Sequence, residues 1–453
     1  MNMVKRVLTV AGSDSGGGAG IQADLKTFAA HGVHGMSAIT CITAQNTEKV
    51  TAIQPIPAEI VREQIKVVVE DIGVDAVKTG MLFSSEIIEA VSDELSNLNT
   101  PIVVDPVAVA KSGAILLREE AVEALVERLF PLATVVTPNI HEASLLTGVQ
   151  ISSTEDMVSA AEKLAAKGPK AVVVKGGHLP GVKSVDILLY AGNTYMYESE
   201  KIETKNTHGT GCCFASAIAS NLAKGYRIPQ AVRMAQRFVV EAVRRGLPLG
   251  RGHGPIHPTG RIYENGCRME ALKSLRQALD MLKDVDEFPN LIPESGSNIV
   301  TAIEDASEPE QVASIPGRIV RLGDGFKPVS EPWFGGSKHV AKAVITVMKH
   351  DPSVRSAMNI RVDENLLKIF ETLNLSVSFY DRAKEPAEVK RVEGMTIPWG
   401  VEEAVKNAGG VPDIIYHLGD VGKEPMALIF GETPLDVVRK VIAIAKKAAG
   451  ESN

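Results

Sequence analysis

Short apolar runs rich in β-branched residues alternate with helical segments through the first 250 residues. This alternation is typical of an α/β fold, in which a parallel sheet carries helices on both faces. Ligands bind beyond the carboxyl ends of the strands in such sheets. The expected strands are 6–10, 36–45, 76–78, 102–105 and 134–137. Helices are expected over 21–30 and from residues 85, 119 and 142.

A segment with two glycines, residues 205–211, leads into an apolar helix of small residues that includes Phe214. Gly209 and Gly211 allow backbone amides to point toward one position, and the helix dipole adds partial positive charge there. We therefore expect an anion site. Cys212 lies at its mouth, where a thiol is expected to have a lowered pKa and to act as a base. The alternative is an ordinary glycine-rich turn beside a buried cysteine.

Polar residues follow several of the expected strands. Asp105 and Glu142 offer oxygen ligands of the kind that Mg²⁺ prefers, although helix capping or solvation also explains such acids. Lys175 follows a valine-rich strand and could neutralise nucleotide phosphate, or it could simply be solvated. Gln45 ends the strand 36–45, where its amide could donate and accept at once, or belong to a turn.

The glycine-rich loop 12–20 follows the first strand and precedes a helix, which is also the setting of a dinucleotide fingerprint. Its spacing does not fit G-x-G-x-x-G, and no acidic partner follows at the right distance. Dinucleotide binding is therefore the weaker interpretation of this loop.

The length of 453 residues predicts two or three domains. Residues 246–266 are rich in Gly, Pro, His and Arg without periodicity, so we expect domains at 1–250 and 267–453 joined by a linker over 251–266. The net charge of −7 suggests neither a nucleic-acid nor a membrane partner. The chain start does not resemble a signal peptide, and no apolar run reaches 18 residues, so we expect a soluble, cytoplasmic protein.

The second half is expected to form a separate α/β domain, which starts with a helix over 268–282. The segment 335–337, Gly-Gly-Ser, opens another helix and is a second candidate anion site. Lys338 and His339 lie in its first turn, and Arg361 follows a strand and could clamp a phosphate. An ordinary helix start with basic surface residues is the alternative.

Motifs in the first half resemble the hydroxymethylpyrimidine/phosphomethylpyrimidine kinases of the ribokinase superfamily, over about residues 1–250. Most of that superfamily has Asp where this chain has Cys212. The sequence departs from the pattern of these kinases at Ala108, where they often carry Met. The matching segments are 11–24, 43–47, 78–81, 104–107, 137–142, 174–178 and 206–212.

This resemblance implies that Mg-ATP phosphorylates the pyrimidine to its monophosphate and then to its diphosphate. Cys212 would be the base, and Gly209 and Gly211 would hold the transferring group. The resemblance also implies a homodimer formed through this domain. A pyridoxal kinase shares the fold, but its base is usually Asp. The remaining implied roles are pyrimidine binding by Gly12, Asp14, Ala19, Gln45, Met81, Val107 and Cys213, ATP binding by Asn139, Lys175 and Thr210, and Mg²⁺ binding by Asp105 and Glu142.

The second half resembles the archaeal-type thiamine-phosphate synthase domain, through segments 359–361, 378–382 and 417–420. That resemblance implies that thiazole phosphate condenses with the pyrimidine diphosphate, and that pyrophosphate leaves. Fixed cations would stabilise this leaving group. The alternative is a thiamine-phosphate sensor, which is expected to carry a helix-turn-helix and to lack reactive residues; neither is seen. The residues expected at this site are Arg318 (or Arg321), His339, Lys338 and Arg361.

Overall fold

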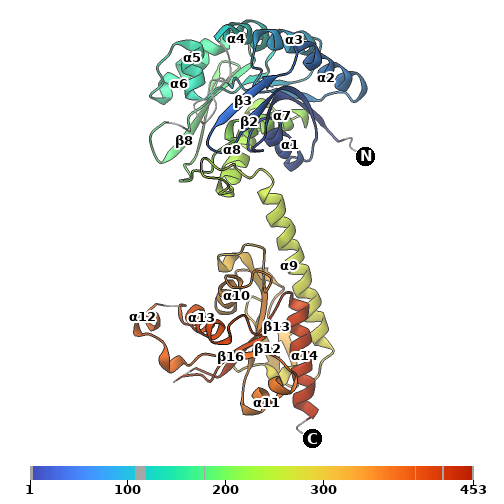
Figure 1. Ribbon diagram of the computed structural model, residues 1–453, viewed down its shortest axis with the longest axis vertical. Coiled ribbons are helices and arrows are strands. Elements are labelled where there is room, and N and C mark those ends of the chain that lie inside the picture. The colour runs from blue at the N-terminus through green and yellow to red at the C-terminus, as the bar shows by residue number, and fades with distance from the viewer. Residues whose placement is uncertain (1–3, 108–118, 178, 393, 421–422, 451–453) are drawn as a thin grey trace. The chain divides into compact units, whose positions relative to one another are not determined.

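The computed structural model describes residues 4–107, 119–177, 179–392, 394–420 and 423–450 (Figure 1). The described chain divides into two compact units, one ending at Ile262 and the next starting at Tyr263. Each unit has its own sheet and its own hydrophobic cores.

Within the described residues, nine strands form the sheet of the first unit in the order β3-β2-β1-β4-β5-β6-β7-β8-β9. The strands from β2 to β7 in this order run parallel, and β3, β8 and β9 are antiparallel to their neighbours. The strands are β1 (Arg6–Asp14), β2 (His34–Gln45), β3 (Val50–Pro55), β4 (Ala76–Thr79), β5 (Ile102–Val104), β6 (Val135–Val136), β7 (Ala171–Lys175), β8 (Lys183–Tyr190) and β9 (Asn193–Glu200).

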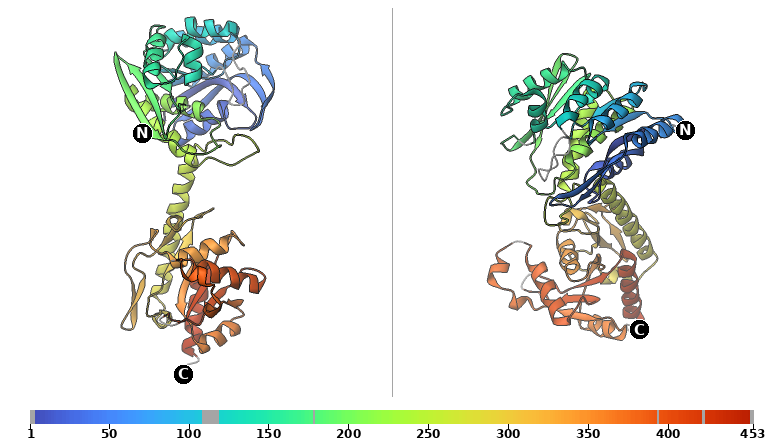
Figure 2. Two further views of the ribbon diagram at one scale, coloured as in Figure 1. Left: turned by 90° about the vertical axis from the view of Figure 1, so that its left-hand side faces the viewer. Right: turned by 45° about the horizontal axis from the view of Figure 1, so that its top comes forward.

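Helices cover both faces of this sheet (Figures 1 and 2), which confirms the predicted fold class. One face packs against α1 (Gly20–Ala30), α7 (Thr210–Ala223) and α8 (Ile228–Arg244). The other packs against α2 (Ala58–Asp71), α3 (Ser85–Ser96), α4 (Glu119–Ala124), α5 (Ile140–Thr147) and α6 (Thr154–Ala165).

A tight turn joins β8 to β9. Ala191 and Gly192 both have positive φ, at 51° and 74°. Two consecutive residues of this kind match the twist of the flanking strands in a two-residue hairpin.

In the described part of the second unit, seven strands form a sheet in the order β14-β11-β10-β15-β18-β17-β16. Helices α10 and α13 cover one face, and α9, α11 and α14 cover the other. A separate hairpin pairs β12 with β13. The strands are β10 (Ile299–Ala302), β11 (Val312–Ser314), β12 (Ile319–Leu322), β13 (Gly325–Pro328), β14 (Trp333–Phe334), β15 (Ser356–Arg361), β16 (Val377–Phe379), β17 (Ile414–His417) and β18 (Met426–Gly431). The helices are α9 (Gly260–Lys283), α10 (His339–Met348), α11 (Glu364–Thr372), α12 (Ala387–Lys390), α13 (Thr396–Ala408) and α14 (Pro434–Gly450).

The segment 251–266 differs from the predicted linker. Its first part is fixed on the first unit, where the amides of Gly252 and His253 donate to Thr47 at 3.2 and 2.9 Å. Its last part is helical, because α9 begins at Gly260, eight residues before the predicted start. Glycines at 260 and 266 are poor helix formers and hide this helical start in the sequence.

No helix in the described ranges combines the length and the apolar character needed to cross a membrane.

Candidate functional site

Polar residues predicted from the sequence gather at the carboxyl edge of the parallel strands in the first unit. Asp14 ends β1, Asp105 follows β5, Asn139 follows β6 and Lys175 ends β7. Helix α7 begins at the same edge, because a Cβ atom built on Gly211 would lie 3.3 Å from Lys175 Nζ. The parallel topology therefore brings separate motifs into one site.

Lys175 and Asp105 form an ion pair beside the start of α7, with 2.9 Å between Nζ and Oδ1. Thr137 donates its hydroxyl to the same carboxylate oxygen at 3.0 Å. Burial opposes the charge on Lys175, but Asp105 and then Glu142 outweigh it and raise the pKa of the ammonium. Lys175 is therefore a fixed cation beside the start of α7.

Asn139 and Glu142 form a capping box at the start of α5. The Asn139 side chain accepts from the amide of Glu142 at 2.9 Å, and the Glu142 carboxylate accepts from the amide of Asn139 at 2.8 Å. Within the described ranges no group of three or more His, Cys, Asp or Glu could enclose a metal ion. Mg²⁺ at phosphate sites commonly uses only one or two carboxylates with water and substrate oxygens, so Asp105 and Glu142 fit that role.

Gly209 is the N-cap of α7 and has φ +85°. A Cβ atom at this position would lie 1.8 Å from the carbonyl oxygen of Gly18, so only glycine fits against the glycine-rich loop. Thr210 donates its hydroxyl to the carbonyl of Thr207 at 2.6 Å, which closes the turn before the helix. The first amides of α7 are thereby presented at the carboxyl edge of the sheet.

The expected lowering of the Cys212 pKa is wrong. Burial raises the pKa of this thiol to about 11, although the charge of Lys78 opposes the rise. Asp24 and Asp105 also disfavour the thiolate. The helix N-terminus favours the thiolate, but burial and the neighbouring carboxylates have a larger effect on the pKa. Neither burial nor these carboxylates can be read from the local sequence.

Asp14 organises the glycine-rich loop and does so together with His208. Its carboxylate accepts from the amides of Gly16, Gly18 and Ala19 at 2.8 to 3.0 Å, and His208 Nε2 lies 3.0 Å from Oδ2. Burial opposes ionisation, but the hydrogen bonds with His208 and Ala19 outweigh it and lower the Asp14 pKa. His208 lies in the matching segment 206–212, but no sequence pattern indicated that it would contact Asp14.

Gln45 lies beside the same histidine. Its Nε2 atom is 3.4 Å from His208 Nε2, and its Oε1 atom accepts from Thr43 at 3.3 Å. The half-buried amide is therefore held at the end of β2, between the glycine-rich loop and the segment before α7.

Gly12, Met81 and Val107, all predicted to contact the pyrimidine, meet in a small apolar cluster. A Cβ atom on Gly12 would lie 2.7 Å from Cys41 Sγ and 3.5 Å from Met81 Sδ. Val107 packs against Cys41 and Met81. Sequence reasoning missed Cys41, whose thiol has a pKa raised to about 11 by burial. Ala108, the noted departure, lies outside the described residues.

Cys213, which was expected to contact the pyrimidine, lies in the core. Its side chain has no exposure, and Sγ lies 4.0 Å from the carbonyl oxygen of Ala23 in α1. Consecutive helix residues point about 100° apart, so Cys212 and Cys213 face different surroundings.

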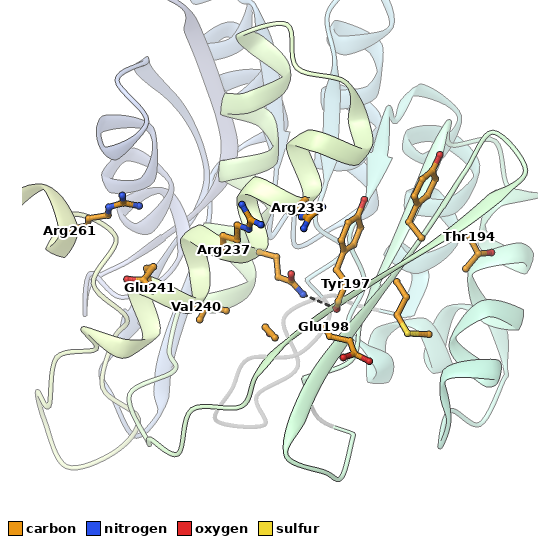
Figure 3. A pocket seen from close by; sticks show the side chains of 12 residues that line it. Thr194, Tyr197, Glu198, Arg233, Arg237, Val240, Glu241 and Arg261 are labelled. Carbon is orange, nitrogen blue, oxygen red and sulfur yellow. Dashed lines mark hydrogen bonds between the residues drawn. The ribbon is translucent and has the colours of Figure 1, made fainter.

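A groove of about 1070 Å³ lies between β9 and α8 (Figure 3). Arg233 and Arg237 of α8 line it together with Tyr197, and none of the residues predicted from the sequence does. Gln236, in the groove wall, donates to Asp186 at 3.3 Å, and Asp186 accepts from the amide of Gly176 at 3.1 Å. Hydrogen bonds through Asp186 therefore connect the groove wall to Gly176, the residue after Lys175. The residues predicted to be catalytic do not line the groove.

In the second unit, β15, β16 and β17 run parallel, so their carboxyl ends share one edge of the sheet. Helix α10 leads back into β15, and His339 is therefore at this edge, exposed at the first residue of α10. Lys338 is the exposed N-cap of α10. Both residues therefore lie at the start of α10, at the carboxyl edge of these strands.

Arg318 has φ +74° and directs its guanidinium to the carbonyl oxygen of Ser295, which precedes β10 at the same edge. Arg361 ends β15 and pairs with Asp363 at 2.8 Å, a contact that stabilises the start of α11. Arg321 lies in the β12–β13 hairpin and donates to the carbonyl of Gly323 at 3.1 Å. Arg318 is thus held at this edge, whereas Arg321 lies in a hairpin outside the seven-stranded sheet.

Two buried asparagines at this edge received no role from the sequence, although Asn359 lies in the matching segment 359–361. Asn359 accepts from the amide of Asn298 at 2.7 Å and donates to the carbonyl of Gly296 at 3.1 Å. The Asn298 side chain in turn accepts from the backbone amide of Ile315 at 2.9 Å and donates to the backbone carbonyl of Ile315 at 2.8 Å. These bonds fix the chain that leads to Arg318.

Comparison with known proteins relates the first unit to kinases. A hydroxymethylpyrimidine/phosphomethylpyrimidine kinase of Streptomyces coelicolor is 50% identical over 250 residues, covering 55% of this chain and 93% of that protein. The thiamine biosynthesis bifunctional protein ThiED of Geobacter sulfurreducens is 53% identical over 252 residues, covering 55% of this chain. The match spans only 51% of ThiED, about half its length.

Solved structures with the same fold include pyridoxal kinases. The Bacillus subtilis pyridoxal kinase in complex with ADP is 41% identical, with a TM-score of 0.54, and the match covers 57% of this chain and 99% of that one. The Staphylococcus aureus pyridoxal kinase in complex with AMP-PCP and pyridoxal is 36% identical, with a TM-score of 0.54, over 57% of this chain and 95% of that one.

Residues 14–257 match the phosphomethylpyrimidine kinase family, and residues 274–443 match the thiamine-phosphate synthase ThiN family. The two resemblances drawn from the motifs are thus confirmed, and pyridoxal kinases are more distant relatives. The chain belongs to the phosphomethylpyrimidine kinase family and joins this kinase domain to a thiamine-phosphate synthase domain, as an enzyme of thiamine biosynthesis.

Proposed function

We propose that the chain carries hydroxymethylpyrimidine through three steps. ATP phosphorylates the alcohol, a second ATP extends the monophosphate to the diphosphate, and thiazole phosphate then displaces pyrophosphate to give thiamine phosphate. The observation that carries the kinase assignment is that the start of α7 lies beside the Lys175–Asp105 ion pair. A Cβ atom added to Gly211 would be only 3.3 Å from Lys175 Nζ.

In the first step, the amides at Gly209 and Gly211 and the ammonium of Lys175 receive the transferring phosphoryl group. Phosphoryl transfer depends mainly on such positioning and charge stabilisation. Cys212 would accept the hydroxyl proton only in its thiolate form, which is a small fraction near pH 7 because burial raises the thiol pKa to about 11, and which the charge of Lys78 stabilises. The second step starts from an anionic phosphate and has less need of a base.

Mg²⁺ would be held by Asp105 and Glu142, and when bound it would neutralise charge on the phosphate oxygens of ATP. Asp105 uses Oδ1 for Lys175 and Thr137, which fixes the carboxylate in place. Asn139 holds the backbone turn that positions Glu142. ATP would approach along this edge, beside Lys175 and Thr210.

The pyrimidine would lie between the Gly12–Met81–Val107 cluster and the amide of Gln45. The glycine-rich loop, with Asp14 and Ala19, would close over it. This placement puts the hydroxymethyl group toward the start of α7, because the loop and Gly209 are in contact.

The synthase step would use Arg318 and His339 for the departing pyrophosphate, with Lys338 and Arg361 as further substrate contacts. We also expect the protein to act in the cytoplasm, as a homodimer formed through the kinase domain. Mass photometry of the full chain tests the dimer.

The deciding experiment incubates the full chain with hydroxymethylpyrimidine, ATP, Mg²⁺ and thiazole phosphate and follows all products by mass spectrometry. Thiamine phosphate is the expected product. Accumulation of the diphosphate, together with binding of thiamine phosphate, would favour a sensor role for the second unit. A parallel reaction with pyridoxal tests the alternative suggested by the pyridoxal kinase structures.

A further inference from the structure

Three side chains with hydrogen-bonding groups meet at the carboxyl edge of β16 and β17 in the second unit. Tyr380 directly follows β16, and His417 is the last residue of β17. Their ring centroids are 5.3 Å apart, and their exposures are only 3% and 7%. Arg382 follows in the short helix 382–384 and acts electrostatically on both rings. The three residues therefore form one cluster.

Two donors of this cluster are buried without acceptors. Among the described residues, Tyr380 Oη and Arg382 Nε have no hydrogen-bond partner. The Arg382 guanidinium forms an ion pair with the buried Glu385 at 3.9 Å, a distance too long for a hydrogen bond, and Glu385 accepts from Thr396 at 2.6 Å. Leaving such groups unpaired is costly, so an acceptor that is supplied from outside the chain would stabilise the site.

His417 adds a third donor. Its Nδ1 atom accepts from the amide of Gly419 at 3.1 Å, which places the ring proton on Nε2. Burial, and then the charge of Arg382, lower the pKa of His417 to about 4. The imidazole is thus neutral near pH 7 and offers Nε2–H for donation.

A phenol, a guanidinium and a neutral imidazole N–H together require a ligand that is rich in acceptors. Phosphoryl oxygens accept hydrogen bonds, and they would give Arg382 Nε the acceptor that its ion pair with Glu385 leaves missing. Resting on the proposed function of the second unit, we propose that Tyr380, Arg382 and His417 form a subsite for a phosphoryl group of a synthase substrate. This subsite uses residues other than Arg318 and His339.

The test uses the full-length protein and supplies pyrimidine diphosphate directly, so that kinase activity does not limit the assay. Tyr380→Phe removes one unpaired hydroxyl. We expect the KM for one phosphorylated substrate to rise about 3- to 10-fold, because one hydrogen bond is lost. The thermal midpoint should stay constant or rise, because the free protein loses an unsatisfied buried group.

Two further variants probe the other donors. Arg382→Gln should raise the same KM about 10- to 100-fold, as expected for a charged hydrogen bond. His417→Asn keeps an acceptor near the Nδ1 position and removes the Nε2 donor, so a rise of about 3- to 10-fold is expected. Tyr416→Phe is the matched control, because Tyr416 stacks on Phe379 at 5.7 Å outside the cluster, and its KM values should not change.

The substrate whose KM rises identifies the source of the phosphoryl group. Calorimetric titration with pyrophosphate and with inorganic phosphate gives a readout independent of turnover. If the parent protein makes no thiamine phosphate, the proposed function fails, and weaker anion binding by the variants still supports the subsite. A Tyr380→Phe protein with a lower thermal midpoint, unchanged KM values and unchanged anion binding would show that the cluster is structural only.

Discussion

Lys78 Nζ lies 2.8 Å from Asp24 Oδ2, and neither side chain has any exposure to solvent. Asp24 also accepts from the hydroxyls of Thr9 and Ser216, at 2.7 and 2.6 Å. Ser216 is one helical turn beyond Cys212 in α7. This ion pair therefore fixes α1, β1, β4 and α7 to one another directly beneath the proposed base.

Replacing Lys78 with Met should lower the free energy of unfolding of the kinase unit by about 3–5 kcal/mol, because Asp24 would remain as a buried, unpaired charge. Urea denaturation monitored by circular dichroism measures this change. Lys183→Met is the control, since Lys183 pairs with Glu198 on the surface, where ion pairs contribute little. Equal stabilities of the two variants would contradict a structural role for the buried pair.

Cys212→Ala should remove the first phosphorylation far more than the second. The neutral alcohol has to lose a proton, whereas the phosphate of the second substrate is already anionic. Separate assays with the alcohol and with the monophosphate measure the two effects. Cys213→Ala is the matched control, because Cys213 is in the core, and catalysis should persist. Equal losses in both assays would indicate that Cys212 shapes the loop and is not a base.

The raised pKa of Cys212 predicts a pH dependence of its reactivity. Because burial holds the pKa at about 11, the thiolate fraction should rise about tenfold per pH unit between pH 7 and pH 10. Iodoacetamide labelling, quantified for the peptide that contains Cys212, tests this slope. A labelling rate that levels off near pH 7 would instead indicate a thiol activated by the helix terminus.

Truncation should distinguish a true linker from an integral segment. The amide of Ile256 donates to the carbonyl of His208 at 3.1 Å, and the amide of His208 donates to the carbonyl of Gly254 at 3.0 Å. A chain that ends at Gly250 lacks these contacts and should lose kinase activity or solubility. A chain that ends at Ile262 should keep both. If the shorter chain is fully active, the segment from residue 251 is dispensable.

The sequence predicted the parts of the fold that depend on local pattern. The alternation of strands and helices located the carboxyl edge, and with it Asp105, Asn139 and Lys175. Gly192 also marks a turn, because glycine readily adopts the positive φ that a tight hairpin requires, whereas nothing in the sequence indicates positive φ at Ala191.

Features that depend on packing between distant segments were not predictable. The pKa of Cys212 depends on burial and on Asp24, which lies 188 positions earlier in the chain. The contact of His208 with Asp14 and the unpaired hydroxyl of Tyr380 also require the folded chain. Cys213 shows the same limit, since a thiol beside a predicted base can equally face the core.

Gln45 provides the sharpest test of the pyrimidine pocket. Its amide is held by Thr43 and His208, so both its donor and its acceptor are oriented before any ligand binds. Gln45→Leu would leave the heterocycle's donor and acceptor unmatched, a cost of roughly 1–3 kcal/mol. We therefore expect the KM for hydroxymethylpyrimidine to rise about 5- to 150-fold while the KM for ATP stays constant.

Steady-state kinetics with each substrate varied separately measures this effect. Gln54→Leu is the control, because the Gln54 side chain is exposed on β3 and donates to the carbonyl of its neighbour Pro55 at 3.2 Å. Its two KM values should equal those of the parent. An unchanged pyrimidine KM in Gln45→Leu would place the ring elsewhere, whereas a parallel rise in the ATP KM would mean that the glycine-rich loop, through Asp14 and His208, had lost its structure.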